Sequence, residues 1–399
     1  MNKTIIDSLL AAMVQCDDGV SDLFFATGKP PLVELHGTLQ EFPIDTPEGF
    51  LESEQIDQLV THLIAGDERL VSDLHRLGSC DCSYSLENIA RFRVNIFRQR
   101  GRKAIVMRKL QTEIPTLDGL GLPPIFKEMV KEKNGFVFVT GSTGSGKTTT
   151  LAAMLNELNR TQQIHIVTLE DPIEFVHPHC QALFNQRELG KDFPDFANGL
   201  RAALRQAPKA ILVGEIRDRE TMEIALTASE TGHVVFSTVH TISAGQTIKR
   251  ILGMFDRDEE DLLRQRLAET VRFVVSQRLV GKIGGGRLLV SEIMGSSLRT
   301  REAIMYGEGE NRTFQDIIEA GSPQGWKTFD QSLLNACKEG LITDETALMH
   351  SAQKNRMTRD LDMLKKLRNQ TREGEVPSGL QLASKREQDS AEKVPAMAM

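Results

Sequence analysis

The feature that most constrains this chain is a glycine-rich stretch that begins at residue 141. It fits the phosphate-loop pattern of a glycine, four residues and then Gly-Lys-Thr. Glycines let the backbone curl so that its N–H groups point inward and form a concave anion site. Lys147 can reach the outer phosphates of a nucleotide, and the Thr148 hydroxyl can ligate Mg²⁺, so the stretch predicts a site for ATP and Mg²⁺. The predicted nucleotide-binding residues here are Gly141, Ser142, Thr143, Gly144, Ser145, Gly146, Lys147, Thr148 and Thr149.

The segments on either side of the loop decide whether this match is meaningful. Residues 135–140 form a short apolar run that indicates a buried strand. Residues 149–158 carry Leu151, Leu155 and Leu158 at helical spacing. A strand, a glycine loop and a helix in this order place a helix N-terminus on the phosphates. The alternative, a glycine-rich turn with a chance Gly-Lys-Thr, does not account for both flanks.

Composition and charge narrow the remaining classes of protein. The 399 residues are 40% hydrophobic, which suits two or more domains with ordinary cores. The net charge of −7 argues against a dedicated nucleic-acid binder. The five cysteines include no Cys-x-x-Cys pair, as expected of reduced thiols in a cytoplasm. No apolar run approaches the roughly 20 residues of a membrane helix, so we expect a soluble, cytoplasmic protein without direct membrane insertion.

The chain divides at a segment rich in proline and glycine, residues 110–124, which has the composition of a linker. Residues 1–109 before it alternate short helix and strand patterns, and predict a small α+β domain. Residues 125–371 after it predict an α/β domain with a largely parallel sheet and C-terminal helices. Residues 372–399 are polar and charged with few large apolar side chains, and predict a disordered tail.

The α/β region contains several apolar runs of strand length, each followed by polar residues. The predicted strands are 135–140, 164–169, 210–214 and 234–238. Ligands of an open α/β sheet lie beyond the carboxyl ends of its strands, so the polar residues that follow should meet around one nucleotide. Further along, residues 258–280 carry apolar side chains at helical spacing and predict a long helix, before a late strand over 287–294.

Three of these polar stretches, together with the phosphate loop, form a recognisable set. They are Glu170-Asp171-Pro172-Ile173-Glu174, Gly214-Glu215-Ile216-Arg217-Asp218, and the pair Thr231-Gly232-His233 and Thr238-Val239-His240. In order and spacing they resemble the Asp box, Walker B motif and His box of the secretion ATPase superfamily. Ser21-Asp22-Leu23, the run Ala90 to Phe97 and Arg100-Gly101 resemble the N-terminal domain of the type IV pilus retraction ATPases, the PilT/PilU family.

This resemblance extends over roughly residues 5–365, and it implies a fold and an assembly. The fold class would be α/β, with an N-terminal PAS-like α+β domain followed by a RecA-like P-loop ATPase domain. The family forms hexameric rings in the cytoplasm, at the inner face of the inner membrane. There the ring acts on the platform protein at the base of the pilus and hydrolyses ATP to power retraction. A PilT/PilU paralogue would be a further partner.

The resemblance also assigns roles to individual side chains, and two carboxylates compete for one of them. Glu170 is expected to activate the attacking water and Glu215 to hold Mg²⁺ with Thr148. The plain alternatives are a turn or capping pair for Glu170 and Asp171, and an ion pair with Arg217 for Glu215. His233 and His240 are expected to sense the γ-phosphate, although such histidines are often simply hydrogen-bonded.

Several arginines crowd the end of the first predicted domain, and guanidinium groups suit bidentate contacts with phosphate. Arg93, Arg100 and Arg108 fall where the family supplies arginines to ATP. The alternative is a solvated basic face.

Three alternative functions are considered from the sequence. An accessory subunit of PilU type, dependent on a PilT partner, would carry the same ATPase motifs. A pilus-assembly or type II secretion ATPase would usually add an N-terminal domain and paired Cys-x-x-Cys motifs. A nucleic-acid motor with a related core would need base-stacking residues, and the chain has one tryptophan and two tyrosines.

Overall fold

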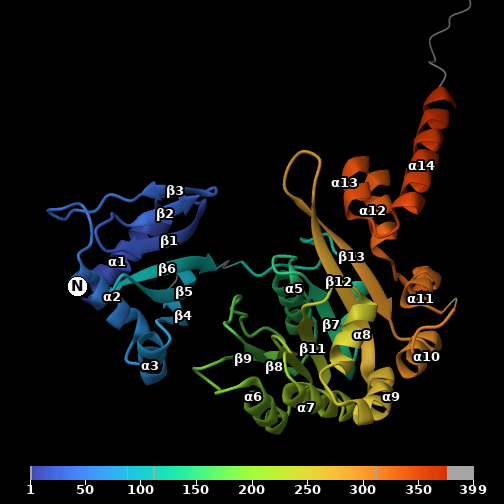
Figure 1. The fold of residues 1–399 in the computed structure, drawn as a ribbon, viewed down its shortest axis with the longest axis horizontal. Helices are drawn as coiled ribbons and strands as arrows, with labels where there is room; N and C mark the ends of the chain where they lie inside the picture. Colours follow the sequence, from blue (N-terminus) through green and yellow to red (C-terminus); the bar gives the residue numbers. More distant parts are fainter. Residues whose placement is uncertain (1, 88, 111–112, 311, 375–399) are drawn as a thin grey trace, which may run out of the picture.

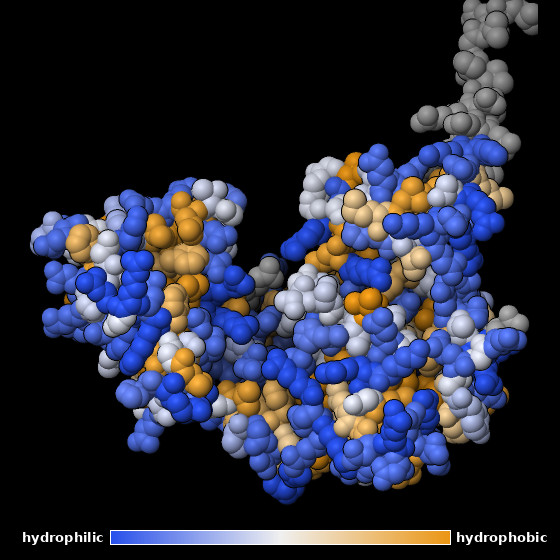
Figure 2. Space-filling model, in the orientation of Figure 1, coloured by the Kyte–Doolittle hydropathy of each residue, from blue (hydrophilic) through white to orange (hydrophobic). Residues whose placement is uncertain are grey.

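A computed structural model describes residues 2–87, 89–110, 113–310 and 312–374. Strands of these residues form two sheets, one of six and one of seven strands, each with helices packed against it (Figure 1). The molecule is therefore of mixed α/β type, and the space-filling view shows a notch between its two lobes (Figure 2). Most of the predicted tail, residues 375–399, lies outside the described residues.

The first sheet is antiparallel and has the strand order β3-β2-β1-β6-β5-β4. Its elements are α1 Lys3–Gln15, β1 Val20–Ala26, β2 Leu32–Leu35, β3 Thr38–Glu41, α2 Ser53–Ile64, α3 Glu68–Arg76, β4 Ser79–Leu86, β5 Ala90–Gln99 and β6 Arg102–Leu110. Period-two alternation in β5 buries Phe92, Val94 and Ile96 in a core with the helices. The same alternation leaves Arg91 and Arg93 on the opposite face.

The second sheet has the order β13-β12-β7-β11-β10-β8-β9, and only the β12–β13 pair is antiparallel. The strands are β7 Gly135–Gly141, β8 His165–Glu170, β9 Leu183–Glu188, β10 Ala210–Val213, β11 Val234–Val239, β12 Val271–Gly281 and β13 Arg287–Gly295. Each of the four predicted parallel strands and the late strand is present within about two residues of its predicted bounds.

Helices surround this second sheet (Figure 1). They are α4 Ile125–Met129, α5 Lys147–Thr161, α6 Phe196–Ala203, α7 Arg219–Glu230, α8 Ala244–Leu252, α9 Glu260–Thr270, α10 Leu298–Tyr306, α11 Phe314–Ala320, α12 Phe329–Lys338, α13 Asp344–His350 and α14 Lys354–Gly374. None of the helices formed by described residues is long and apolar enough to cross a bilayer.

One predicted element is wrong. The long helix over residues 258–280 ends at Thr270, and the remainder is the strand β12. The strand lies between β7 and β13, and Val274 and Val275 are fully buried there. Valine is restricted at χ1 and packs better on a pleated sheet than in a helix, which accounts for the switch at Val271.

Candidate functional site

A cavity of about 760 Å³ opens where the sequence predicts the nucleotide, beyond the carboxyl ends of β7, β8, β10 and β11. Its walls include the phosphate loop, the residues after β8 and β10, and His240 after β11. Arg93 and Arg108 of the first sheet close another side. The polar residues that follow the parallel strands are therefore brought together, as the sheet topology requires.

The phosphate loop has the backbone that its glycines allow. Gly141, Gly144 and Gly146 have φ values of 146°, 76° and 89°, which L side chains rarely adopt. A Cβ on Gly141 would lie 2.4 Å from Ser145 Oγ and 2.6 Å from the Gln277 carbonyl oxygen. Helix α5 starts at Lys147, so its free N–H groups and dipole face the cavity and favour an anion.

Lys147 is positioned within the loop rather than extended into solvent. Its Nζ donates to the carbonyl oxygens of Gly141 and Ser142 at 2.9 and 3.0 Å. Burial lowers the pKa of Lys147, although the charges of Glu215 and Glu174 oppose that effect. An ammonium group held beside the N–H groups of the loop is suited to bind a phosphate, which would replace the carbonyl contacts.

The two glutamates of the segment after β8 have different surroundings. Glu170 is buried, and its Oε1 accepts hydrogen bonds from Thr168 Oγ1 at 2.5 Å and Gln186 Nε2 at 2.9 Å. Burial raises the pKa of Glu170 to about 7, against the lowering effect of those two hydrogen bonds. Glu170 thus lines the cavity with its carboxylate held by donors from its own strand and from β9.

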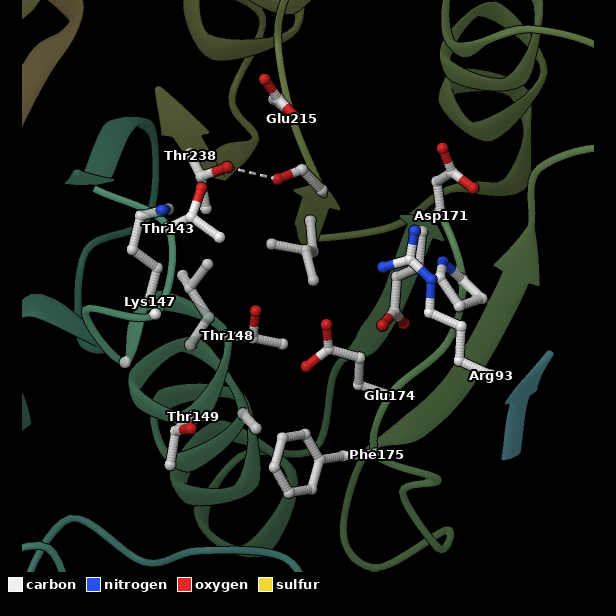
Figure 3. Close-up of a pocket in the computed structure, with 18 of the residues that line it drawn as sticks. Arg93, Thr143, Lys147, Thr148, Thr149, Asp171, Glu174, Phe175, Glu215 and Thr238 are labelled. Carbon is white, nitrogen blue, oxygen red and sulfur yellow. Dashed lines mark hydrogen bonds between the residues drawn. The ribbon is translucent and has the colours of Figure 1, made fainter. Parts of the chain in front are cut away.

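Glu174 instead points into the cavity opposite Thr148, with Arg93 reaching in from the same side (Figure 3). Burial raises the pKa of Glu174, while the Arg93 charge, a hydrogen bond with Thr148 and the Lys147 charge lower it. Glu174 belongs to the stretch that resembles the Asp box, but no role was predicted for it from the sequence. Strand alternation offers no signal for it, because β8 is buried on both faces and Glu174 lies in the segment after the strand.

Glu215 follows β10 and joins two other polar residues at the cavity. Its Oε2 lies 2.7 Å from Arg217 Nη2, and its Oε1 lies 3.3 Å from His240 Nε2. Burial would raise the pKa of Glu215, but the hydrogen bonds and charges of Arg217 and His240 outweigh it and hold the pKa below its usual range. The ion pair considered as an alternative is present, and the carboxylate still lines the cavity.

The two histidines of the predicted His box do not lie together. His240 lines the cavity after β11, whereas His233 precedes the strand, at its other end. Six residues of strand separate them by roughly 20 Å. His233 Nδ1 lies 3.0 Å from the Ala228 carbonyl oxygen. The structure therefore brings His240 to the cavity and keeps His233 away from it.

The predicted arginines also separate. Arg93 and Arg108 are paired across β5 and β6 and line the cavity. Arg108 Nε also donates to Asp22 Oδ1 at 2.8 Å. Arg100 lies in the turn between β5 and β6 with φ 50°, seven residues or roughly 23 Å along the strand from Arg93. It is not among the described residues around the cavity.

The oxygen donors of the cavity fit Mg²⁺. Thr148, Glu174 and Glu215 offer a hydroxyl and two carboxylates, the ligand types that this ion prefers. No group of three or more His, Cys, Asp or Glu residues among the described residues could hold a metal alone.

The chain is similar to a known family of proteins. Residues 79–286 match the family model described as type II/IV secretion system protein. The chain is 41% identical over 329 residues to the type IV pilus retraction ATPase PilT of Pseudomonas aeruginosa, covering 82% of this chain and 93% of that one. It is 36% identical over 363 residues to the type IV pilus ATPase PilU of Pseudomonas aeruginosa, covering 90% and 91%.

A solved structure extends the similarity to the fold. The pilus retraction motor PilT with bound ADP superposes with a TM-score of 0.78 at 38% identity, covering 89% of this chain and 99% of that chain. The described strands and helices therefore have a PilT-like ATPase fold. The chain belongs to the PilT/PilU family of type IV pilus retraction ATPases, within the type II/IV secretion system proteins.

Proposed function

We propose that this chain is an ATP-hydrolysing motor that powers retraction of type IV pili and so twitching motility. The observation that carries the proposal is the cavity that Lys147, Thr148, Glu174 and Glu215 line together. Similarity to PilT over 93% of that relative's length supports the assignment to retraction.

This geometry supports the following catalytic roles. The loop N–H groups and Lys147 hold the β- and γ-phosphates, and Arg93 supplies charge from the other side of the cavity. Thr148 and Glu215 would hold Mg²⁺, which neutralises charge on the phosphates. Glu174, in place of Glu170, positions the attacking water and accepts its proton. The water oxygen bonds to the γ-phosphorus, the bond from that phosphorus to the bridging oxygen breaks, and ADP leaves.

Glu174 is the better candidate for the base for two reasons. Its carboxylate points toward Thr148 and Lys147, where the γ-phosphate would lie (Figure 3). Glu170 has its Oε1 occupied by two donors from β8 and β9. His240 contacts Glu215 and can respond to the nucleotide through it. We assign no part in this chain's own cavity to His233 or Arg100.

The organisation of the chain is part of the proposal. Residues 1–109 form a PAS-like domain, 110–124 a linker and 125–371 a RecA-like ATPase domain. Six chains form a ring in the cytoplasm at the inner face of the inner membrane, and the ring acts on the pilus platform protein. The grouping of the described strands into two separate sheets supports the division.

A second candidate function is that of an accessory retraction ATPase that works beside a PilT paralogue. The similarity to PilU, over 91% of that relative, favours this candidate over an assembly motor. Counting surface pili on cells whose gene carries Lys147→Ala distinguishes the retraction motor, the accessory ATPase and the assembly motor. We expect excess pili and lost twitching. Normal pili with weakened movement would assign the accessory role, and bare cells would contradict retraction altogether.

A further inference from the structure

The two sheets meet at a polar contact beside the cavity that the proposed mechanism does not use. Glu188 is the last residue of β9 and pairs in register with Glu170 at the end of β8. Its side chain is 5% exposed. Its Oε1 accepts from Ser83 Oγ at 2.7 Å and lies 2.8 Å from Lys191 Nζ. Its Oε2 accepts from Arg91 Nη2 at 2.5 Å. One buried carboxylate therefore joins the second sheet to β4 and β5 of the first.

The donors around this carboxylate also hold one another. Lys191 Nζ donates to Ser83 Oγ at 2.6 Å, and Arg91 Nη2 lies 3.2 Å from the same hydroxyl. Burial would raise the pKa of Glu188, but hydrogen bonds from Lys191 and Ser83 and the charges of Lys191 and Arg91 outweigh it. The pKa is held below its usual range, so Glu188 is ionised and the contact is a charged one.

Two features connect this contact to the cavity. Ile173 N donates to Glu188 Oε2 at 3.3 Å, which fixes the backbone immediately before Glu174. Arg91 and Arg93 are two residues apart on β5 and share one face of that strand. Arg93 lines the cavity and acts electrostatically on Glu174. The same carboxylate therefore reaches both the loop that carries Glu174 and the strand that carries Arg93.

We propose that Glu188 is a positioning residue that clamps the first sheet to the edge of the second and thereby holds Arg93 over the nucleotide. This inference rests on the proposed role of Arg93. The closeness of the contact supports it, because the adjoining cavity beside Arg93, Glu188 and Lys191 is only about 30 Å³, room for about one water molecule. Small displacements of β5 are therefore resisted by packing as well as by charge.

The first test is ATP turnover by the full chain carrying Glu188→Gln. An amide would present a donor to Arg91 or Lys191, which are themselves donors, so the clamp should loosen. We expect kcat to fall about 10- to 100-fold, because misplacing a reacting group by about 1 Å has an effect of that size. The KM for ATP should change less than about threefold, because the phosphate loop is intact. Glu220→Gln is the matched control, since it removes an exposed ion pair with Arg201, and it should leave kcat unchanged.

The second test separates positioning from general stability. In an Arg93→Ala background, Glu188→Gln should lower kcat by less than about threefold further, because the group that it positions is gone. An undiminished further loss would overturn the clamp while leaving the role of Arg93 intact. If Arg93→Ala alone left kcat unchanged, both the role of Arg93 and the clamp would fail.

A third variant covers the case in which Glu188→Gln does not fold. Arg91→Met removes the contact from β5 and leaves Glu188 paired with Lys191 and with Ser83 of β4. It should reproduce the fall in kcat, and Arg91→Lys, which keeps one charged donor, should restore most of it. Wild-type turnover by Arg91→Met would overturn the proposal.

Discussion

The two glutamates at and after the end of β8 differ in their surroundings, although they lie only four residues apart. Glu170 and Glu174 belong to one short motif and have the same side chain, so composition and spacing cannot separate them. Their positions separate them, because Glu170 ends β8 and accepts hydrogen bonds from Thr168 and Gln186, whereas Glu174 lies in the segment after the strand and points into the cavity. By contrast, the phosphate loop and Glu215 could be located from the sequence, because strand ends and glycine spacing fix where they lie.

The two glutamates give a direct comparison. Glu174→Gln should lower kcat by about 10²- to 10⁴-fold, the usual effect of losing a general base. Glu170→Gln keeps the Oε1 acceptor for both of its donors, so it should lower kcat less than about tenfold. Steady-state ATPase assays on both variants, with bound nucleotide measured separately, decide the matter. A larger loss for Glu170→Gln would return the role to that residue.

Glu170 should also make stability depend on pH. Burial raises its pKa from 4.5 to about 7 in the folded protein, so the unfolded chain loses this proton first as the pH rises. Stability is therefore greatest below about pH 4.5 for this group and falls until about pH 7. Glu170→Gln does not ionise, so its melting temperature relative to wild type should rise between pH 5 and pH 8. A constant difference across that range would contradict the assigned pKa shift.

At the scale of elements, the sequence predicted the parallel strands well and one helix badly. The strands are apolar runs that end at polar residues, and period and length both identify them. Residues 262–275 place leucines and valines at spacings that suit a helix, yet the valines after Thr270 form β12. The requirement for a strand comes from tertiary structure, because this segment hydrogen-bonds to β7 on one side and to β13 on the other. The enrichment in valine was the local signal that favoured it.

The backbone is tightly constrained where β7 meets the phosphate loop. Gly141→Ala would bring a Cβ within 2.6 Å of the Gln277 carbonyl oxygen at a φ of 146°. We expect a loss of stability of about 1–3 kcal/mol and much weaker ATP binding, as the loop shifts. Gly281→Ala is the control, because no described heavy atom lies within 4 Å of its Cβ and its φ is ordinary. Melting curves and titration with a fluorescent ATP analogue measure both effects; equal behaviour of the two variants would contradict this account.

In the whole molecule, residues from two sheets line one cavity. This arrangement of the sheets is the feature of the structure that the sequence predicts least well. Ser83, Arg93, Arg108 and Asp22 are register partners on successive strands, so they form one row across the first sheet. Nothing in the spacing of these residues shows that they share a row. The row appears once the strand order is known, and it explains why Arg93 and Arg108 reach the cavity while Arg100, at the end of the same hairpin, does not.

Arg93 belongs to the first sheet, whereas the phosphate loop belongs to the second. Nucleotide binding should therefore depend on both lobes. Arg93 lies near Glu174 and opposite Lys147 (Figure 3), so it should contact the γ-phosphate more than the rest of the nucleotide. A charge-assisted hydrogen bond is worth about 1.5–3 kcal/mol, or roughly 10- to 100-fold in affinity. Arg93→Ala should weaken binding of a non-hydrolysable ATP analogue by that factor and binding of ADP by less than about threefold.

Calorimetric titration measures both affinities. Arg102→Ala is the control, because Arg102 is an exposed arginine of β6. Equal weakening for the two nucleotides would place Arg93 on the β-phosphate instead, and unchanged binding of both would remove the first sheet from nucleotide recognition.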